Sequence, residues 1–209
     1  MVFNSSAFLI FFPVVVSVYY ILPQKIRSYW LLIVSYYFYM SWNAKYAILI
    51  LFSTVITYLT GILIGRFRAI ENESKKRIKQ IKICVFICFL INLGLLFFFK
   101  YYEFFFHNFT KLFSLIGMHF SAPVFDVILP VGISFYTFQA LGYCIDVYRG
   151  EIRAEKSFFK YALFVSFFPQ LVAGPIERSG NLLNQLTVPA PLSYNRFREG
   201  IFLMLWGFF

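Results

Sequence analysis

The sequence predicts an all-α integral membrane protein, a multi-span helical bundle that contains broken or re-entrant helices. Composition is the first reason, because 60% of the 209 residues are hydrophobic and only 13% are charged, whereas soluble domains are about a quarter charged. The second reason is a series of long apolar segments. The third is the apolar run Phe158–Leu186, which is interrupted by Pro169, by Gly174-Pro175 and then by Glu177-Arg178.

This interrupted run has the wrong order of residues for a plain spanning helix. Proline removes a backbone donor and disfavours helix in the residue before it. Non-helical backbone at membrane depth is tolerated only where protein buries it or where it lines a wet cavity. We therefore expect Phe168–Arg178 not to cross as a regular helix, and Gly174-Pro175 to lie beside a water-accessible cavity. The alternative is a helix that ends at Pro169 and continues as an ordinary loop.

The first half of the chain contains four apolar segments and one strongly polar stretch. The segments are Ala7–Leu22, Tyr29–Trp42, Tyr46–Ile64 and Ile83–Phe99, of which the second is short for a span of about 20 residues. The polar stretch Arg66–Lys82 holds seven basic residues against Glu71 and Glu73. Because basic loops stay in the cytoplasm, this loop is predicted to be cytoplasmic and the N-terminus external.

The second half continues the same alternation of sides. An aromatic loop, Tyr101–Phe125, is expected outside and in the membrane interface, and Val127–Ile145 then returns the chain. The next loop is basic and carries Arg149, Arg153, Lys156 and Lys160. All basic loops fall on one side, which predicts one polytopic membrane domain over 1–209. The chain ends inside an apolar run, LMLWGFF, so we expect the N-terminal portion of a larger domain.

Polar side chains interrupt the fifth apolar segment. They are Ser134, Thr137, Gln139 and Asp146. Gln139, Tyr143 and Asp146 follow one another at i+4 and i+3 steps and share one helix face. Polar groups inside a membrane usually face a bundle interior or a cavity. They therefore either line a substrate path or form structural hydrogen bonds between helices. In the second case Asp146 reaches Arg149 or Arg153.

The residues of this chain offer no convincing catalytic or metal centre. A catalytic base needs a shielded pocket and a partner, and neither His107 nor His119, both in the aromatic loop, has an obvious one. Cys84 and Cys88 share a helix face without a further ligand at metal-binding spacing, which favours packing over a metal site. The net charge of +10 has no base-reading motif beside it, so no nucleic-acid partner is expected.

Four stretches taken in order carry a family resemblance. They are MVFNSSAFLIFFPVVVSVYYILP, NLGLLFFFKYYEFF, LPVGISFYTFQALGYCIDVYRG and SFFPQLVAGPIER. With them the chain resembles the membrane-bound O-acyltransferase family over essentially its whole length. It is most similar to the branch that supplies acetyl groups to exported polysaccharides such as alginate. The sister branch, which passes D-alanine towards teichoic acid, is similar around GPIER.

The resemblance implies a ring of spanning and broken helices around a central tunnel. In it an acyl donor, acetyl-CoA or another acyl carrier, meets an acceptor from the opposite side, with no bound cofactor and no metal. The family's catalytic histidine, often accompanied by an asparagine, would lie beyond Phe209, so no catalytic residue is assigned here. The candidate residues of the tunnel wall are Ser134, Gln139, Tyr143, Gln170, Gly174, Pro175, Glu177 and Arg178.

The resemblance also implies a place and partners. The protein is expected in the bacterial cell membrane as a multi-pass protein, in contact with lipid, with the acyl donor and with periplasmic or extracellular acetyltransferase proteins that act downstream. Two other functions fit the residues: a transporter or flippase that moves its substrate unchanged along the polar stripe, and a scaffold that binds proteins through the basic loop. D-alanyl transfer is the alternative within the family.

Overall fold

The computed structural model describes residues 1, 3–68, 75–114, 129–171, 174, 177–188 and 193–208. Within these ranges the chain is helical and has no strand, which confirms the all-α prediction for this part of the chain. The helices are α1 Ser6–Ile21, α2 Gln24–Met40, the 3₁₀ turn η1 Ala44–Tyr46, α3 Ala47–Arg68, α4 Lys75–Ser114, α5 Ile133–Arg149, α6 Phe158–Ser166, α7 Phe168–Leu171, α8 Ser179–Thr187 and α9 Tyr194–Phe208.

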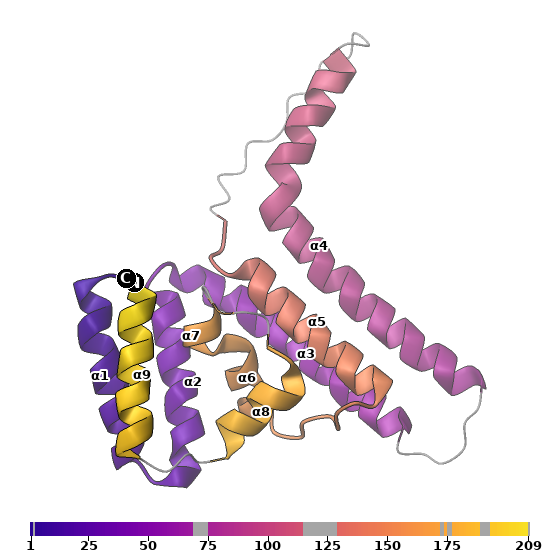
Figure 1. The fold of residues 1–209 in the computed structure, drawn as a ribbon. Coiled ribbons are helices and arrows are strands. Elements are labelled where there is room, and N and C mark those ends of the chain that lie inside the picture. Colours follow the sequence, from indigo (N-terminus) through magenta and orange to yellow (C-terminus); the bar gives the residue numbers. More distant parts are fainter. Residues whose placement is uncertain are drawn as a thin grey trace.

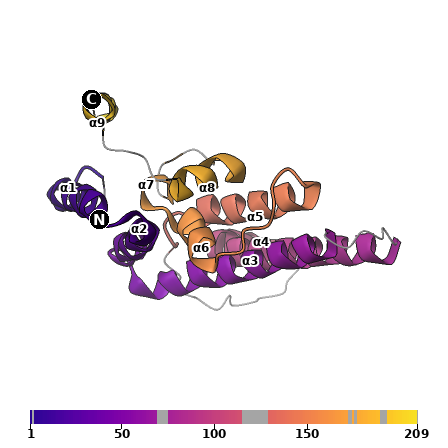
Figure 2. The same ribbon diagram turned by 90° about the horizontal axis from the view of Figure 1, so that it is seen from below.

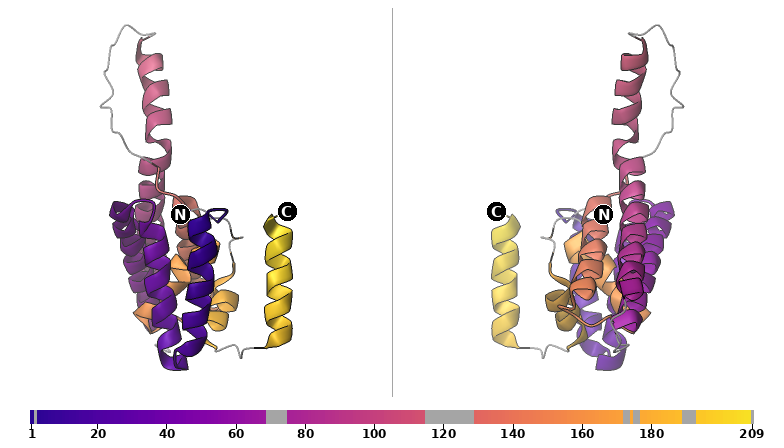
Figure 3. Two further views of the ribbon diagram at one scale, coloured as in Figure 1. Left: turned by 90° about the vertical axis from the view of Figure 1, so that its left-hand side faces the viewer. Right: turned by 90° about the vertical axis from the view of Figure 1, so that its right-hand side faces the viewer.

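The helices α3, α4 and α5 pack side by side, and α2 joins them to α6 and α7 (Figure 1). The helix α1 packs on the outer side of α2. In contrast, α9 stands apart from the other helices, as Figures 2 and 3 show from two further directions. The buried core therefore lies between α2, α3, α5 and α6 and extends to the first half of α4.

The buried face of α3 is built from small hydroxyl residues. Ser53, Thr54 and Thr57 are at most 2% exposed. Thr54 Oγ1 donates to the Ile50 carbonyl at 2.6 Å, and Thr57 Oγ1 donates to the Ser53 carbonyl at 2.7 Å. Helices in lipid associate through close packing rather than through the hydrophobic effect, and small side chains let their backbones approach closely. This face explains why α3 lies so close to α5.

The helix α4 corrects the predicted loop Tyr101–Phe125. It continues without interruption to Ser114, so the first part of that loop is helix, whereas its membrane-capable part ends at Tyr102, close to the predicted end of the fourth apolar segment. The sequence 100–114 has no glycine or proline, and aromatic pairs one turn apart, such as Tyr102 and Phe106 with ring centres 4.5 Å apart, favour a continued helix. Residues 115–125 lie outside the described residues.

The predicted basic loop Arg66–Lys82 is also shorter than expected. Its first part ends α3 and its last eight residues begin α4, while residues 69–74 are not among those described. Within the described part of the chain, two helical segments are long and apolar enough to cross a bilayer, Ala44–Arg68 and Lys75–Tyr102, and α1 is a shorter apolar helix. These features indicate a helical membrane protein.

Candidate functional site

The interrupted run enters the bundle and leaves it at the same end of α2. At the start of α6, the Phe159 ring lies 5.4 Å from the Tyr29 ring. At α7, the Phe168 ring lies 5.4 Å from the Phe38 ring, and at the end of α8 the Ser28 hydroxyl donates to the Leu186 carbonyl at 3.3 Å. From residue 29 to residue 38 a helix rises about 14 Å. The segment α6–α8 therefore doubles back within the bundle, and its contact at Phe38 lies close to the far end of α2, Met40; we call it the re-entrant segment.

The described backbone confirms that Phe168–Arg178 is not one regular helix. The helix α6 ends at Ser166, Phe167 is not helical, and α7 is a single turn. Gly174, Glu177 and Arg178 are also outside any helix, and α8 begins at Ser179. Pro175, which the sequence analysis placed in the tunnel wall, lies outside the described residues.

Two side chains satisfy the backbone groups that the break at Phe167 sets free. In an unbroken helix the Phe168 N–H would donate to the Phe164 carbonyl, four residues earlier. Instead, Gln139 Nε2 donates to the Phe164 carbonyl at 2.7 Å, and the Phe168 N–H donates to Ser35 Oγ at 3.3 Å. Gln139 is 4% exposed and Ser35 is fully buried. Side chains of α5 and α2 thus stabilise the break by hydrogen bonds to the backbone on either side of it.

Gln170 and Gly174 complete this arrangement. Gln139 Nε2 also lies 3.5 Å from Gln170 Oε1, and the Gly174 N–H donates to the Gln170 carbonyl at 3.0 Å. A Cβ atom on Gly174 would lie 2.7 Å from the Gln170 Cα, closer than side-chain carbons approach backbone, so glycine permits this return of the chain. Three of the predicted wall residues, Gln139, Gln170 and Gly174, therefore meet at one place.

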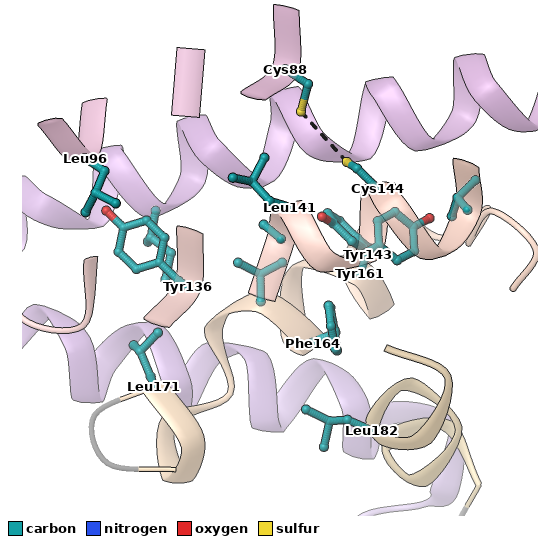
Figure 4. Close-up of a cluster of buried hydrophobic side chains, with 14 of the residues drawn as sticks. Cys88, Leu96, Tyr136, Leu141, Tyr143, Cys144, Tyr161, Phe164, Leu171 and Leu182 are labelled. Atoms are coloured by element: carbon teal, nitrogen blue, oxygen red, sulfur yellow. Dashed lines mark hydrogen bonds between the residues drawn. The ribbon is translucent and has the colours of Figure 1, made fainter. Parts of the chain in front are cut away.

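Tyr143 belongs to a different part of the core. Its ring is fully buried with a centre 4.5 Å from the Tyr161 ring (Figure 4), and its hydroxyl accepts a hydrogen bond from the Glu155 N–H at 2.9 Å. The Tyr161 hydroxyl donates to Thr57 Oγ1 at 2.7 Å. These contacts join α5, α6 and α3 beside the loop that precedes α6.

The pair Cys88 and Cys144 lies next to this tyrosine pair, between α4 and α5. Their sulfur atoms are 3.8 Å apart, as the dashed line in Figure 4 marks, and both thiols are buried. Asn92, one turn along α4 from Cys88, accepts a hydrogen bond from Ser53 at 2.5 Å. No group of three His, Cys, Asp or Glu side chains able to hold a metal ion is found among the described residues.

The expected ion pair of Asp146 is wrong. Asp146 accepts a hydrogen bond from the Ser179 hydroxyl at the start of α8, and Arg149 pairs with Glu151 at 3.6 Å. Sequence spacing favoured an arginine three residues away. The fold instead packs the start of α8 against the end of α5, so that the Ser179 hydroxyl donates to the Asp146 carboxylate.

The remaining predicted wall residues lie at the surface or on another face. Ser134 Oγ accepts a hydrogen bond from Lys100 Nζ at 3.3 Å, which places it towards α4 and away from the break. Glu177 and Arg178 are exposed, and Glu177 accepts a hydrogen bond from Asn181 at 3.2 Å. The structure thus brings Gln139, Gln170 and Gly174 together, and it leaves the other described wall candidates apart from them: Ser134, Tyr143, Glu177 and Arg178.

Sequence reasoning missed a cavity at the other end of α2. It has a volume of about 240 Å³ and is lined by Tyr39, Trp42, Asn43, Tyr46, Leu129 and Val131. The signal was present in the short connection SWNAKY between α2 and α3, where aromatic rings surround a single asparagine. In sequence it looks like a plain connection between two apolar segments. The cavity forms because Leu129 and Val131, which precede α5, complete its lining.

The chain is similar throughout to O-acetylating proteins. It is 34% identical over all 209 residues to "Probable alginate O-acetylase AlgI" of Pseudomonas aeruginosa, covering 38% of that protein, and 34% identical to the protein of the same name from Azotobacter vinelandii, covering 40%. It is 32% identical to the "Peptidoglycan O-acetyltransferase" of Helicobacter pylori, again over the whole chain and 43% of the relative. The chain thus spans about two-fifths of the length of these relatives. No family model matches it, and no solved structure matches it significantly.

Proposed function

We propose that this chain, similar along its whole length to the N-terminal part of curated O-acetylases, forms the front part of a membrane O-acyltransferase core. The parent protein then transfers an acyl group, most simply acetyl, from a cytoplasmic donor towards an exported polysaccharide. The observation that carries the proposal is the similarity over all 209 residues to relatives named for alginate and peptidoglycan O-acetylation.

The re-entrant segment supports this function by its chemistry. Making an ester from a thioester donor requires a base that takes the proton of the acceptor hydroxyl, and a dry path that limits hydrolysis. The break in α6–α7 supplies such a wall, because Phe164, Phe168 and Leu171 are buried around it and its freed backbone groups at Phe164 and Phe168 are hydrogen-bonded. Gln139, Gln170 and Gly174 are the wall residues that we assign to this path.

The base itself is assigned elsewhere in the parent protein. His107 is exposed on the part of α4 that extends past the bundle, and His119 lies outside the described residues. The exposed position of His107 lacks the shielding that a general base needs. We therefore assign the catalytic histidine to the part of the relatives' length that this chain does not span. The acyl donor, acetyl-CoA or another acyl carrier, acts as co-substrate, and periplasmic or extracellular acetyltransferase proteins act downstream.

The orientation follows from the basic side chains. Lys25 and Arg27 at the start of α2, Arg66 and Arg68 at the end of α3, and the basic start of α4 lie at the end of the bundle where the re-entrant segment enters. By the positive-inside rule this end is cytoplasmic and the N-terminus is external. The donor then approaches the re-entrant segment, and the acceptor approaches the end that holds the 240 Å³ cavity.

A sidedness assay tests the proposal. The full-length gene is restored to its own bacterium after deletion of the chromosomal copy, so that the downstream acetyltransferase proteins are present, and sealed vesicles are prepared in both orientations. Acetyl-CoA labelled in the acetyl group is added to the outside. We expect base-labile acetyl ester on polysaccharide from inside-out vesicles, and from right-side-out vesicles only after permeabilisation.

Vesicles from the same host without the gene are the control. Labelled D-alanine in a parallel reaction tests the sister activity. Absence of labelled ester in both orientations, with acetyl-CoA and with an acylated carrier protein, would refute acetyl transfer.

A further inference from the structure

We infer that the α5–α6 loop, residues 150–157, together with Arg68 binds the phosphate groups of the acyl donor, which is therefore a nucleotide thioester of the CoA type. This inference rests on the proposed function and its orientation, because it names the class of donor and the place where the donor first binds. The loop lies at the end of the bundle where the re-entrant segment enters, since it leads directly into α6.

Hydrogen bonds to the core fix the second half of this loop. The Glu155 N–H donates to the hydroxyl of buried Tyr143 at 2.9 Å, and the Lys156 carbonyl accepts a hydrogen bond from the Tyr58 hydroxyl at 2.6 Å. The Glu155 carboxylate accepts a further hydrogen bond from the Ser157 N–H at 2.8 Å. The backbone that carries the Lys156 side chain is thus held in one position before any ligand binds.

Close packing fixes the first half of the loop. Gly150 has a φ of +81°, a left-handed conformation that favours glycine, and a Cβ atom there would overlap the Arg68 guanidinium. The Arg68 side chain therefore lies directly over the start of the loop. On the other side, a Cβ atom on Gly180 would lie 3.2 Å from Ile152 Cγ2, so the loop also contacts the start of α8. A preorganised surface of this kind loses less entropy when it binds a ligand.

The carboxylates of the loop are already occupied, whereas its cations are not. Glu151 pairs with Arg149 at 3.6 Å, and Glu155 is bonded to the backbone. Three exposed cations have no carboxylate partner among the described residues: Arg68, Arg153 and Lys156. An excess of positive charge on a rigid surface attracts anions, and arginine binds phosphate through two parallel hydrogen bonds.

The position of these cations suits a donor that has a phosphate-bearing end and a thioester end. Tyr58 connects the two places, because its hydroxyl bonds to the loop while its ring centre lies 5.3 Å from the ring of Phe158, the first residue of α6. Phosphates bound at the loop therefore hold the donor beside the entrance to the re-entrant segment. A CoA thioester has this construction, since its phosphates lie at one end of a flexible arm and its acyl group at the other.

The composition of the exposed surface favours a small anion over an acylated carrier protein. The core of a protein–protein interface is depleted of charged residues and enriched in aromatic residues. The exposed residues of the loop are instead glycine or charged: Gly150, Glu151, Arg153 and Lys156. A phospholipid headgroup shares the phosphate chemistry of CoA, so the test includes both sources of phosphate.

Binding of CoA to the full-length protein tests the inference without requiring turnover. The protein is reconstituted in nanodiscs of zwitterionic phosphatidylcholine, and CoA, 3′-dephospho-CoA and pantetheine are titrated by isothermal titration calorimetry. The three probes share the thiol arm and differ in their phosphates. We expect saturable binding of CoA, weaker binding of 3′-dephospho-CoA and the weakest binding of pantetheine, with a Kd for CoA that rises with ionic strength.

A double variant that removes charge locates the site. Arg153→Gln with Lys156→Gln removes two exposed cations and leaves the hydrogen bond of the residue 156 carbonyl intact. We expect the Kd for CoA to rise about threefold to tenfold and the Kd for pantetheine to stay unchanged. Arg153→Lys with Lys156→Arg keeps the charge and most of the affinity. The matched control is Lys45→Gln, an exposed cation in η1 at the opposite end of the bundle, which leaves CoA binding unchanged.

Three results would overturn the inference. The first is equal affinity for CoA and pantetheine, or CoA binding that survives the double variant. The second is a double variant that loses thermal stabilisation by phosphatidylglycerol in the nanodisc but binds CoA normally, because the loop then binds a lipid headgroup. The third is acetyl transfer from an acylated carrier protein and not from acetyl-CoA.

Acetyl transfer in the vesicle assay separates this inference from the proposed function. A protein that binds CoA through the loop but forms no acetyl ester from any donor would refute the proposed function alone. A protein that forms the ester from acetyl-CoA with an unchanged KM in the double variant would refute the phosphate site alone.

Discussion

Replacing Gln139 by leucine is expected to destabilise the protein through one orphaned carbonyl. Leucine has nearly the volume of glutamine, so packing changes little, but the Phe164 carbonyl loses its 2.7 Å donor. Leaving a buried acceptor unpaired costs about 1–3 kcal/mol, whereas hydrogen bonds between membrane helices average about 0.6 and reach about 1.7 kcal/mol. The described residues offer no second donor to this carbonyl, so we expect a loss of about 1–2 kcal/mol.

Ser35→Ala tests the other half of the same break. It removes the acceptor of the Phe168 N–H, whose bond is longer at 3.3 Å, and we expect a loss of about 1 kcal/mol. In the double variant both the N–H and the carbonyl lack partners. They cannot pair with each other, because the Pro169 ring would clash with the carbonyl four residues earlier if the helix closed.

Adding Pro169→Ala to the double variant therefore has a definite expected result. The helix is then able to close, the Phe168 N–H reaches the Phe164 carbonyl, and stability is regained while the re-entrant shape and acetyl transfer are lost. The measurement is the thermal midpoint of the full-length protein, by fluorescence-detected size-exclusion chromatography. For proteins of 150–250 residues 1 kcal/mol shifts the midpoint by about 2–4 °C, and the shift is smaller for the longer full-length protein.

The matched control is Gln185→Leu, which removes an exposed amide on α8 that donates only to a neighbouring surface side chain, Asn181. A surface substitution of this kind changes stability by less than about 0.5 kcal/mol. If Gln139→Leu shifts the midpoint no more than Gln185→Leu does, the break is not held by this hydrogen bond. If Pro169→Ala fails to restore stability, helix closure is not the competing state.

Further substitutions probe the packing, the α5–α8 contact and the topology. Gly61→Val should cost about 1–3 kcal/mol, because a Cβ there would lie 2.7 Å from the Tyr143 ring, whereas Gly94→Ala, with nothing within 4 Å, should be neutral or stabilising in the same thermal assay. Ser179→Ala should cost about 1 kcal/mol by removing the hydrogen bond to the α5 aspartate; an unchanged midpoint would contradict that contact. Lys76→Cys should resist an impermeant thiol reagent in intact cells, and labelling without lysis would reverse the orientation.

The break in the re-entrant segment was predictable because its cause is local. Proline acts on its own backbone and on the residue before it, so Pro169 marked the interruption before any packing was known. The groups that stabilise the break were not predictable in the same way. Ser35 lies 133 positions from Phe168 in sequence, and only the packing of α2 against α7 selects it.

The end of α4 was predicted wrongly, because the loop expected from Tyr101 onwards begins as helix. The change from an apolar to a more polar sequence at Lys100 does not end a helix, whereas proline and glycine do. The sequence beyond it contains good helix-supporting aromatic pairs and no glycine or proline to Ser114. The partner of Asp146 failed for a different reason, since spacing along one helix says nothing about which element packs across its end.

The polar residues of this protein therefore fall into two groups that sequence alone does not separate. At the re-entrant break, Gln139 and Ser35 bond to backbone groups that the fold itself has freed, which explains their presence inside an apolar bundle without any ligand. The hydroxyls of Tyr36 and Tyr39 are buried without a hydrogen-bond partner within the described residues. A polar side chain in an apolar segment of this chain therefore does not by itself indicate a substrate contact, and Gln139 in the polar stripe of α5 is first of all what stabilises the break.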